Sequence, residues 1–410
     1  MSATARAMEF LVKSVECNDE LRQIHALFAE NHPLNGDARE AYNYLQTNGA
    51  GYPQFEQEHT RIVTRGREVV AGLRLTTDTL RLGEARLKMG GIGWVTTAAA
   101  YRGRGICTLL MHDVIAYMKQ HRYHVSMLFG IPDFYHRFNY VTTLADYAIR
   151  MDTREALTFE APFQIRPGKV GDIRAIQKIH TADDQDVACS LLRTARHIGC
   201  KWHRLSEMKV MTDDQGKVLA YIVIGEGSEY LEVREVGALE PGMLAGVVGA
   251  CGRIAAAMAY DQVKFRVPPT HVFARYMLQF RSLHETHVQR DAGGMMAFID
   301  IGETLESMIP EWESRIAESA IRDISTECTL VVGQHSYRLR AHRGALNAAA
   351  ANGKNKISLT EGELMHLLTG YRYLDDVLNG KRLLLTLDAR HLLETLFPKR
   401  CPFVWPFDRF

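Results

Sequence analysis

Several features that define broad classes of protein are missing from the 410-residue sequence. No run of 18 or more apolar residues is present, so the chain has no segment typical of a membrane-spanning helix. The 49 Lys and Arg residues nearly balance the 48 Asp and Glu residues, and the formal charge of +1 argues against binding nucleic acid through bulk charge. We therefore expect neither a membrane nor a nucleic acid as partner.

Paired cysteines are missing as well. The seven cysteines are scattered, odd in number and include no Cys-x-x-Cys pair, which argues against a disulfide framework and a zinc ribbon. The apolar stretch Phe10–Val12 is followed by Lys13 and is too short for a secretory signal. These features predict a cytoplasmic protein without a bound metal.

The composition that remains is globular, with 46% apolar and 24% charged residues. At about 150 residues per domain, the length predicts two to three domains. The order of strand-like and helical segments divides the chain into units over residues 1–150, 151–304 and 305–410. The first two units have related α/β patterns, whereas the third is different in kind.

The first unit alternates helices and strands, and the second repeats much of that order. In the first, the expected segments are a helix from Asp19, a hairpin over residues 60–77, a strand at Trp94–Thr97, a helix from Ile106 to Met118 and a strand at Tyr123–Phe129. In the second, they are a strand at Gln164–Pro167, a helix from Asp172, strands at 219–224 and 230–236, and a helix over 243–258. The first helix of each unit ends its apolar stripe in Ile-His, at Ile24-His25 and Ile179-His180.

The third unit begins near residue 305 and has its own local signals. A hairpin is expected around Gly333-Gln334, and Thr360 with Glu363 forms a capping box that opens a helix. The tail after Cys401 is short and rich in aromatic residues, which gives it enough apolar surface to dock.

A Gly-rich turn in the first unit carries the clearest chemical signal. It reads Arg102-Gly103-Arg104-Gly105-Ile106-Cys107-Thr108, between a strand and a helix. Glycines let successive backbone N–H groups converge, and a helix N-terminus adds partial positive charge, so the segment suits a pyrophosphate. An ordinary strand-to-helix turn explains the spacing equally well. The second unit has no Arg-x-x-Gly in the corresponding segment, residues 237–242.

Two motifs in the right order resemble the GNAT acetyltransferases. Arg102, Gly105 and Cys107 match the Arg/Gln-x-x-Gly-x-Gly/Ala turn of that family, with Cys in place of the last small residue. The segment from Gly130 to Tyr140 is similar to the family's Gly-x-Pro-x-(Phe/Tyr)-Tyr-x-x-Phe-Gly-(Phe/Tyr), with Asn139 replacing the second Gly. One helix and one strand separate the two motifs.

The layout of the whole chain resembles the Eis (enhanced intracellular survival) acetyltransferases. That resemblance implies two tandem GNAT folds, each a mixed sheet with flanking helices, and a C-terminal α+β domain like sterol carrier protein 2. It implies acetyl-CoA as co-substrate, small-molecule or protein amines as acceptors, and a homohexamer. By the same resemblance, Tyr135 is the general acid and the terminal carboxylate of Phe410 is the base. The implied acetyl-CoA contacts are Val95, Thr96, Thr97, Arg102, Gly103, Arg104, Gly105, Ile106, Cys107, Thr108, Gly130 and Ile131.

These two roles agree with the chemistry of acyl transfer to an amine. An alkylamine with a pKa of about 10.4 is mostly ammonium at neutral pH, and a carboxylate can take its proton once burial raises the low pKa of a terminal carboxyl. A phenol can protonate the thiolate that leaves. Without the flanking motif, Tyr135 would be read as an ordinary half-buried tyrosine, and Phe410 as a frayed end.

Other segments give weaker signals. The two histidines of His284-Glu285-Thr286-His287 are three residues apart, whereas the zinc-protease motif needs four, so a solvated helix or loop is expected. Cys107 is read as a packing residue rather than a nucleophile, and Arg338, Arg340 and Arg343 as a hydrated strand face. An acceptor pocket is expected around His32, Asp37, Glu40, Tyr42 and Tyr44.

A different class of function also fits the layout. In this alternative the protein binds lipid or acts as a scaffold through its third unit, and the two GNAT-like units are vestigial. The turn beside Tyr135 argues against it, whereas the loss of the turn from the second unit argues for it.

Overall fold

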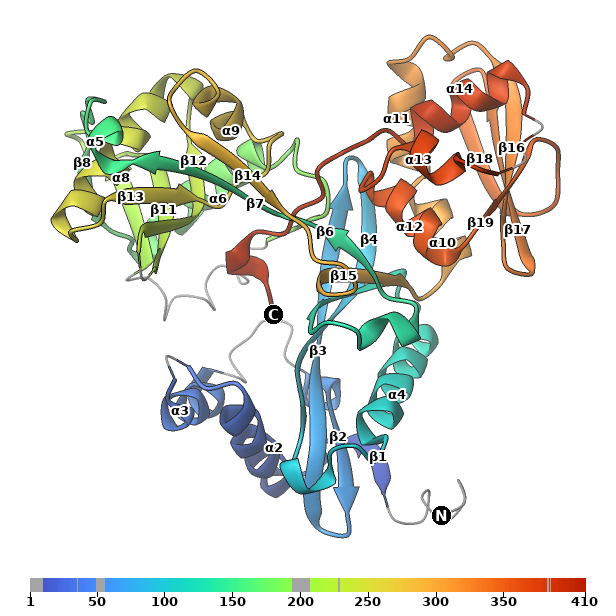
Figure 1. Ribbon diagram of the computed structural model, residues 1–410, viewed down its shortest axis with the longest axis horizontal. Coiled ribbons are helices and arrows are strands. Elements are labelled where there is room, and N and C mark those ends of the chain that lie inside the picture. The colour runs from blue at the N-terminus through green and yellow to red at the C-terminus, as the bar shows by residue number, and fades with distance from the viewer. Residues whose placement is uncertain are drawn as a thin grey trace.

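The computed structural model describes residues 10–34, 36–48, 56–193, 207–227, 229–381, 383 and 385–410, and it shows three lobes (Figure 1). The start of the chain and Cys200, on which two sequence expectations depended, lie outside these residues. The other six cysteines are free thiols. Among the described helices, none has both the length and the apolar composition that a bilayer crossing requires.

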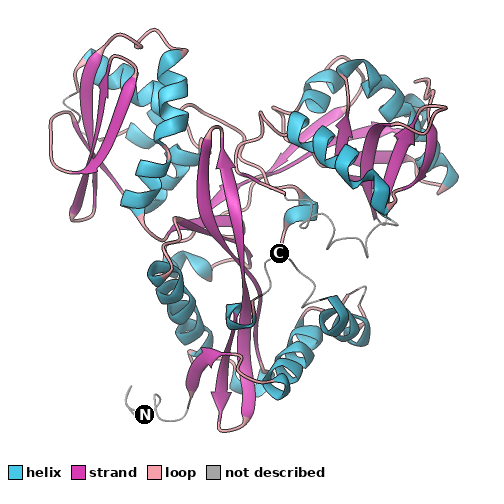
Figure 2. Ribbon diagram, turned by 180° about the vertical axis from the view of Figure 1, so that it is seen from behind, coloured by secondary structure: helices cyan, strands magenta, loops and turns pink. Residues whose placement is uncertain are grey.

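The first lobe is built on a mixed sheet with helices on both faces. Its strands, in spatial order, are β1 (Leu11–Ser14), β2 (Thr60–Arg65), β3 (Glu68–Leu82), β4 (Ala85–Thr97), β5 (Val125–Gly130), β15 (Gly293–Phe298) and β6 (Val141–Leu144), with the short β9 (Ser190–Leu191) beside β3. Helices α2 (Asn18–Asn31) and α3 (Ala38–Asn48) lie on one side, and α4 (Ile106–Gln120) lies on the other (Figures 1 and 2).

Strand β4 is much longer than the Trp94–Thr97 strand expected from the sequence. It starts at Ala85 and runs beside β3 as a long hairpin that projects between the second and third lobes (Figure 1). The first part of this strand was not predicted because it contains three glycines. Glycine is depleted in strands and has no side chain to contribute to an alternating apolar pattern. The expected hairpin over residues 60–77, the helix from Ile106 and the strand before Gly130 are confirmed.

The second lobe repeats the topology of the first. Its strands, in spatial order, are β8 (Gln164–Pro167), β10 (Met208–Thr212), β11 (Val218–Glu226), β12 (Leu231–Ala238), β13 (Gln262–Phe265), β7 (Asp146–Asp152) and β14 (Leu283–His287). Its helices are α5 (Thr153–Ala156), α6 (Ile173–Asp183), α8 (Leu244–Ala257) and α9 (Val272–Met277). In both sheets the fourth and fifth strands are parallel and their other neighbours are antiparallel, so the relation between the two units holds in three dimensions.

The two sheets exchange one strand each. In the first sheet, β15 lies between β5 and β6, although its residues follow the whole second unit in sequence. In the second sheet, β7 occupies the same slot between β13 and β14, although it directly follows β6 of the first unit. The sequence position 150/151 therefore falls inside a strand of the second sheet.

The third lobe has a four-stranded sheet covered by helices. The strands are β18 (Ala345–Ala350), β17 (His335–His342), β16 (Ser325–Val332) and β19 (Lys356–Leu359). The helices are α10 (Ile301–Ser307), α11 (Ile309–Ala317), α12 (Glu361–Thr369), α13 (Leu374–Leu378) and α14 (Leu387–Leu396). The capping box is confirmed, since Thr360 Oγ1 accepts from Glu363 N at 3.1 Å and Glu363 Oε2 accepts from Thr360 N at 2.8 Å. The mixed α/β class is as expected, and the likeness to sterol carrier protein 2 stays a prediction.

The C-terminal tail leaves the third lobe, crosses the second and ends beside the first (Figure 1). Phe403 and Trp405 are in the apolar core of the second lobe, and each is 1% exposed. Phe407 is 2% exposed and packs near α6 and β11. The aromatic tail therefore docks, as its composition predicts.

Candidate active site

A cleft opens in the first sheet where strands β4 and β5 separate. Their parallel pairing runs from Met89 with Val125 to Ile92 with Leu128 and then stops, although β4 continues for five residues. A bulge lies in this continuation, because Leu73 alone stands opposite Trp94 and Val95, and Trp94 has a φ of 57°. The bulge turns β4 away from β5, and no strand among the described residues pairs with the edge that faces the gap.

The Gly-rich turn lies at the mouth of this cleft, as the sequence predicts. Gly103 and Gly105 have φ values of 73° and 79°, which favour glycine, and Gly105 caps the N-terminus of α4. Because glycine has no capping side chain, the first N–H groups of α4, from Ile106 to Thr108, keep no intrahelical or cap acceptor. Such N–H groups and the helix dipole form an anion site.

Arg102 fixes the turn to its surroundings. Its Nε donates to Thr97 O at 3.1 Å, and its Nη2 donates to Asn31 Oδ1 at 2.5 Å. The guanidinium thus joins the end of β4 to the end of α2 while its exposed edge adds positive charge at the turn.

Most of the predicted site residues line one cavity of about 1410 Å³ in this cleft. The predicted residues that line it are Val95, Thr96, Thr97, Arg102, Gly103, Gly105, Ile106, Cys107, Thr108, Ile131, Tyr135 and Phe410. Arg104 and Gly130 are not in the lining. The guanidinium of Arg104 lies 5.4 Å from the centre of the Tyr101 ring instead.

Gly130 makes room for Tyr135. A Cβ at Gly130 would lie 2.5 Å from Tyr135 Cδ2, so only glycine lets the ring pack on the end of β5. Phe134 holds the ring from another side, with the two ring centres 4.9 Å apart. Tyr135 is 7% exposed, and burial raises its pKa above the ordinary value of a phenol. Its hydroxyl therefore stays protonated at neutral pH and can serve as a proton donor.

Cys107 shares this environment. Burial raises the pKa of its thiol to about 11, and the charge of Arg137 offsets only part of that effect. A thiol with this pKa is protonated at neutral pH, which agrees with a packing residue and not with a nucleophile.

Phe410 lies on a floor of two glycines in β4. A Cβ at Gly91 would lie 2.6 Å from Phe410 Cζ, and a Cβ at Gly93 would lie 2.8 Å from the Phe410 carboxyl carbon. The Phe410 ring also packs edge-on against Phe129, at a centre distance of 6.0 Å. The carboxyl group thus reaches the cleft because residue 93 has no side chain. The glycine-rich run in β4 was the available sequence signal, since glycine inside a strand marks a close approach.

One side of the cavity is lined by aromatic and acidic residues. Of the residues expected to form an acceptor pocket, His32, Glu40 and Tyr44 line it, whereas Asp37 and Tyr42 do not. Asp37 instead accepts hydrogen bonds from the backbone N–H groups of Arg39 and Glu40, at 2.7 and 3.3 Å, where α3 begins. The lining also includes residues that the sequence did not assign to the site, among them Asn31, Trp94, Glu207 and Arg409.

Trp94 and Glu207 have different origins. Trp94 comes from the bulge in β4, and its ring packs against Phe28 and His32 at centre distances of 5.8 and 5.7 Å. Glu207 directly precedes β10 of the second lobe. A residue brought in by another lobe gives no local sequence signal.

The histidines of the sequence His284 to His287 do not converge on a metal. They lie on β14, an exposed edge strand paired with β7, and not on the helix or loop expected. Residues three apart in a strand point to opposite faces. Within the described residues, Glu56, Glu58 and His59 form another possible metal-holding group, but Glu58 already accepts a hydrogen bond from Tyr117 at 2.8 Å.

The cleft suits acetyl-CoA in three respects. The N–H groups of the turn suit its pyrophosphate, the edge of β4 beyond Ile92 can pair with the amides of its pantetheine arm, and Tyr135 and Phe410 line the same cavity. Apolar side chains between these points, including Ile92, Leu128 and Phe134, suit the rest of the arm.

Comparison with known proteins agrees with this geometry. Residues 18–143 match the family model described as acetyltransferase (GNAT) domain. No curated protein matches the chain by sequence. Among solved structures, the chain is similar to a GCN5-related N-acetyltransferase from Anabaena variabilis, with a TM-score of 0.73 at 16% identity over 98% of this chain and 100% of that one.

Two further structures are similar over the same length. A probable N-acyltransferase from Enterococcus faecalis has a TM-score of 0.72 at 13% identity, and Eis1 from Mycobacterium abscessus has a TM-score of 0.61 at 13% identity. Each comparison covers 98% of this chain and 100% of the other. At these identities the similarity shows a shared fold. GNAT domains use acetyl-CoA, and the match over residues 18–143 identifies the chain as an enzyme with a GNAT acetyltransferase domain.

Proposed function

We propose that the protein transfers an acetyl group from acetyl-CoA to a primary amine by direct attack, with Tyr135 as general acid and the carboxylate of Phe410 as base. The observation that carries this proposal is that a protonated, buried phenol and the Phe410 carboxyl group border the same cavity as the anion-binding turn. Acetyl-CoA supplies the thioester whose acyl carbon receives the amine. In the net reaction a C–N bond forms, a C–S bond breaks, the amine loses a proton and the sulfur gains one.

Tyr135 suits the donation of that proton to sulfur. Burial keeps its hydroxyl protonated, and a thiolate generated in the same place is destabilised by the same burial. The nearby Cys107 thiol, with its pKa raised to about 11, shows how strongly this environment disfavours a thiolate. The same burial raises the pKa of the phenol, so Tyr135 suits this role because its hydroxyl is protonated and borders the cavity, not because burial drives the transfer.

The Phe410 carboxylate suits the opposite task. It lies above Gly93 on the edge of β4, so an amine that enters the cavity can give its proton to it directly or through a water. The ring of Phe410 on Gly91 and the ring of Phe129 fix its orientation.

We further propose that the acceptor is a cationic compound with several amines, such as an aminoglycoside, or a protein lysine. The aromatic faces of Tyr44 and Trp94, which attract ammonium groups, line the acceptor side together with the acidic residues Glu40 and Glu207, the second of which pairs with Arg234 at 3.5 Å. The homohexamer implied by the Eis resemblance is part of the proposal. Sedimentation at the mass of six chains supports it, and a stable monomer contradicts it.

The first experiment replaces Tyr135 by Phe. We expect kcat for CoA release to fall by about 100-fold or more, the range of general acid catalysis, with acetyl-CoA affinity nearly unchanged. Tyr140→Phe is the control, because Tyr140 is a fully buried neighbour whose hydroxyl donates to Ser126 at 2.7 Å outside the cavity. Equal kcat values for Tyr135→Phe and the wild type would contradict the general acid role.

The second experiment adds three residues after Phe410. We expect the extended protein to bind acetyl-CoA in calorimetry but to lose most of its activity, since the carboxylate moves away from Gly93. A fully active extended protein excludes the base role. A wild-type protein that binds no acetyl-CoA excludes the acetyltransferase reading and leaves the lipid-carrier alternative.

A further inference from the structure

The second lobe has a cleft in the same place as the first, and the tail fills it. Strands β12 and β13 pair from Leu231 with Val263 to Val233 with Phe265, and then β12 continues to Ala238 beside β11 but no longer beside β13. A register shift beside β11 follows at this point, as in the first lobe. The side chain of Glu235 lies just beyond the separation and is 0% exposed.

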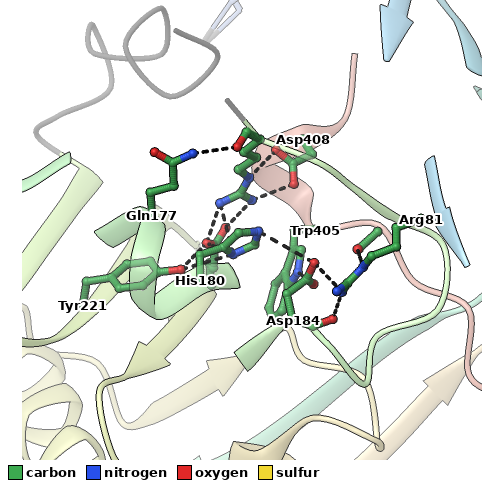
Figure 3. Close-up of polar contacts among 10 residues, drawn as sticks. Arg81, Gln177, His180, Asp184, Tyr221, Trp405 and Asp408 are labelled. Atoms are coloured by element: carbon green, nitrogen blue, oxygen red, sulfur yellow. Dashed lines mark hydrogen bonds and ion pairs between the residues drawn. The ribbon is translucent and has the colours of Figure 1, made fainter. Parts of the chain in front are cut away.

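A buried ion network in this cleft binds the tail. Both oxygens of Glu235 accept from the guanidinium of Arg193 at 2.7 Å, and both oxygens of Asp408 accept from the same guanidinium at 2.7 and 2.6 Å. The Tyr221 hydroxyl donates to Glu235 at 2.6 Å. Figure 3 shows Asp408 of the tail approaching the cluster formed around His180 and Tyr221. One cation thus joins the second sheet to the tail.

A second link lies three residues before Asp408. Trp405 Nε1 donates to Asp184 Oδ1 at 2.9 Å, and Asp184 Oδ2 accepts from Arg81 at 2.9 Å. Arg81 belongs to β3 of the first sheet (Figure 3). The tail is therefore held at a point where both lobes meet.

The tail between the network and the cavity is short. Only Arg409 separates Asp408 from Phe410, a span of at most about 7 Å. Arg409 donates to Asp146 at 2.6 Å, and its guanidinium lies 4.6 Å from the centre of the Phe129 ring. A change in the position of Asp408 must therefore pass to the carboxyl group above Gly93.

We propose that Arg193 and Asp408 are positioning residues for catalysis, so that the second lobe places the Phe410 carboxylate in the active site of the first. This inference rests on the proposed role of Phe410. In place of a phosphate-binding turn, the second lobe has a buried site for a carboxylate of its own chain. Neither residue is among those that line the cavity, and each acts through the tail.

The test uses Asp408→Asn in the full-length protein. This variant keeps the size of the side chain and the Arg193–Glu235 pair, whereas removing Arg193 would leave two buried carboxylates facing each other. We expect kcat to fall by about tenfold to 100-fold, because a misplacement of ~1 Å can cost ~100-fold, while acetyl-CoA affinity changes less than about twofold. Asp186→Asn is the control, since Asp186 forms an exposed pair with Arg275 in the same lobe, at 3.4 Å.

A second readout does not depend on activity. Carboxypeptidase Y should release Phe410 from Asp408→Asn at least about tenfold faster than from the wild type or Asp186→Asn, as followed by mass spectrometry, because proteolysis requires local release. If the tail of Asp408→Asn resists carboxypeptidase Y as the wild type does, Asp408 does not anchor the tail. A released tail with unchanged kcat overturns the positioning role.

The same series separates this inference from the proposed function. If the protein extended after Phe410 is inactive while Asp408→Asn keeps wild-type kcat, the positioning role fails and the base role stands. If the extended protein is fully active, the base role fails and the positioning role fails with it. If no amine promotes CoA release by the wild type, the proposed function fails, and the carboxypeptidase result alone decides whether Asp408 anchors the tail.

Discussion

The clefts of the first and second lobes have the same strand arrangement, but the first is open and the second is filled by the C-terminal tail. In each lobe the fourth and fifth strands are parallel, separate after a few residues and leave one strand edge unpaired. In the first lobe, glycines border the gap and a cavity of about 1410 Å³ remains. In the second, the Arg193 guanidinium pairs with both Glu235 and Asp408 inside the gap. The strand arrangement is therefore shared, and the residues that border each gap decide whether it stays open or is filled by the tail.

The same comparison extends to the first helix of each lobe. His25 on α2 and His180 on α6 are both buried, at 2% and 4% exposed. His25 Nε2 lies 3.4 Å from the Arg74 guanidinium, whereas His180 Nδ1 lies 3.2 Å from Glu235. The Ile-His repeat in the sequence therefore marks corresponding positions whose electrostatic surroundings have diverged.

The largest effect is expected from removing the cation of the filled cleft. Arg193→Met should lower the free energy of unfolding by about 3–5 kcal/mol in urea denaturation, because Glu235 and Asp408 lose their buried counter-ion. Arg102→Met in the open cleft should cost less than about 1 kcal/mol, since that side chain is exposed. If both variants lose the same free energy of unfolding, Arg193 is no more important for stability in its cleft than Arg102 is in the open one.

The next effect concerns the turn that only the open cleft has. Gly105→Val should weaken acetyl-CoA binding by about fivefold to 30-fold in calorimetry, because holding the turn in its left-handed backbone conformation costs a branched residue ~1–2 kcal/mol. Gly242→Val is the matched change before α8 of the second lobe, where the added atoms meet open space and the backbone is ordinary. If both variants bind acetyl-CoA like the wild type, the turn is not the anion site.

A smaller effect is expected at the glycine floor. Gly93→Ala places a methyl group 2.8 Å from the Phe410 carboxyl carbon, so the carboxyl must shift and kcat should fall by about tenfold. Acetyl-CoA affinity should change little. Gly171→Ala, in the second lobe with nothing near its Cβ, serves as control in the same CoA-release assay. If kcat stays at the wild-type value, the position of the Phe410 carboxyl group does not determine turnover.

The smallest effect is a pH dependence of stability that arises from His25. Burial and then the charge of Arg74 lower the pKa of His25 to about 4, against about 6.5 in an unfolded chain. Between these values the unfolded state binds more protons, so stability is complete above pH 6.5 and falls as the pH drops towards 4. His25→Gln should reduce the stability lost between pH 7 and pH 5 by about 1 kcal/mol, and His335→Gln, at an exposed site, should not. Identical pH profiles for the wild type and His25→Gln would exclude this contribution.

Sequence patterns predicted the parts of the site that are local. The turn from Arg102 to Thr108 and the position of Tyr135 depend on residues that are near one another in the chain, and glycine, helix caps and aromatic motifs mark such places. Even in these segments, two of the residues predicted to contact acetyl-CoA do not line the cavity. Gly130 makes room for Tyr135, and Arg104 lies over the ring of Tyr101.

The remaining features depend on contacts between distant segments. Arg193, Glu235 and Asp408 are ordinary polar residues in the sequence, and only the fold brings them into one buried cluster. The exchange of β7 and β15 is equally hidden, because a strand's sequence does not state which sheet it joins. Glu207 reaches the acceptor side for the same reason.

The exchange of β15 also determines when the first sheet can be completed during synthesis of the protein. Gly293 pairs with Gly130, 163 residues earlier in the chain, so the first sheet stays incomplete until the ribosome has translated nearly the whole second unit. At ~5–20 residues per second, β5 waits about 10–30 s for its neighbour. During that interval an unpaired strand edge is open to aggregation or to chaperones. A protein fragment that ends at residue 150 lacks β15, so the edge of β5 would stay exposed. We therefore do not expect the first lobe to fold without the second unit.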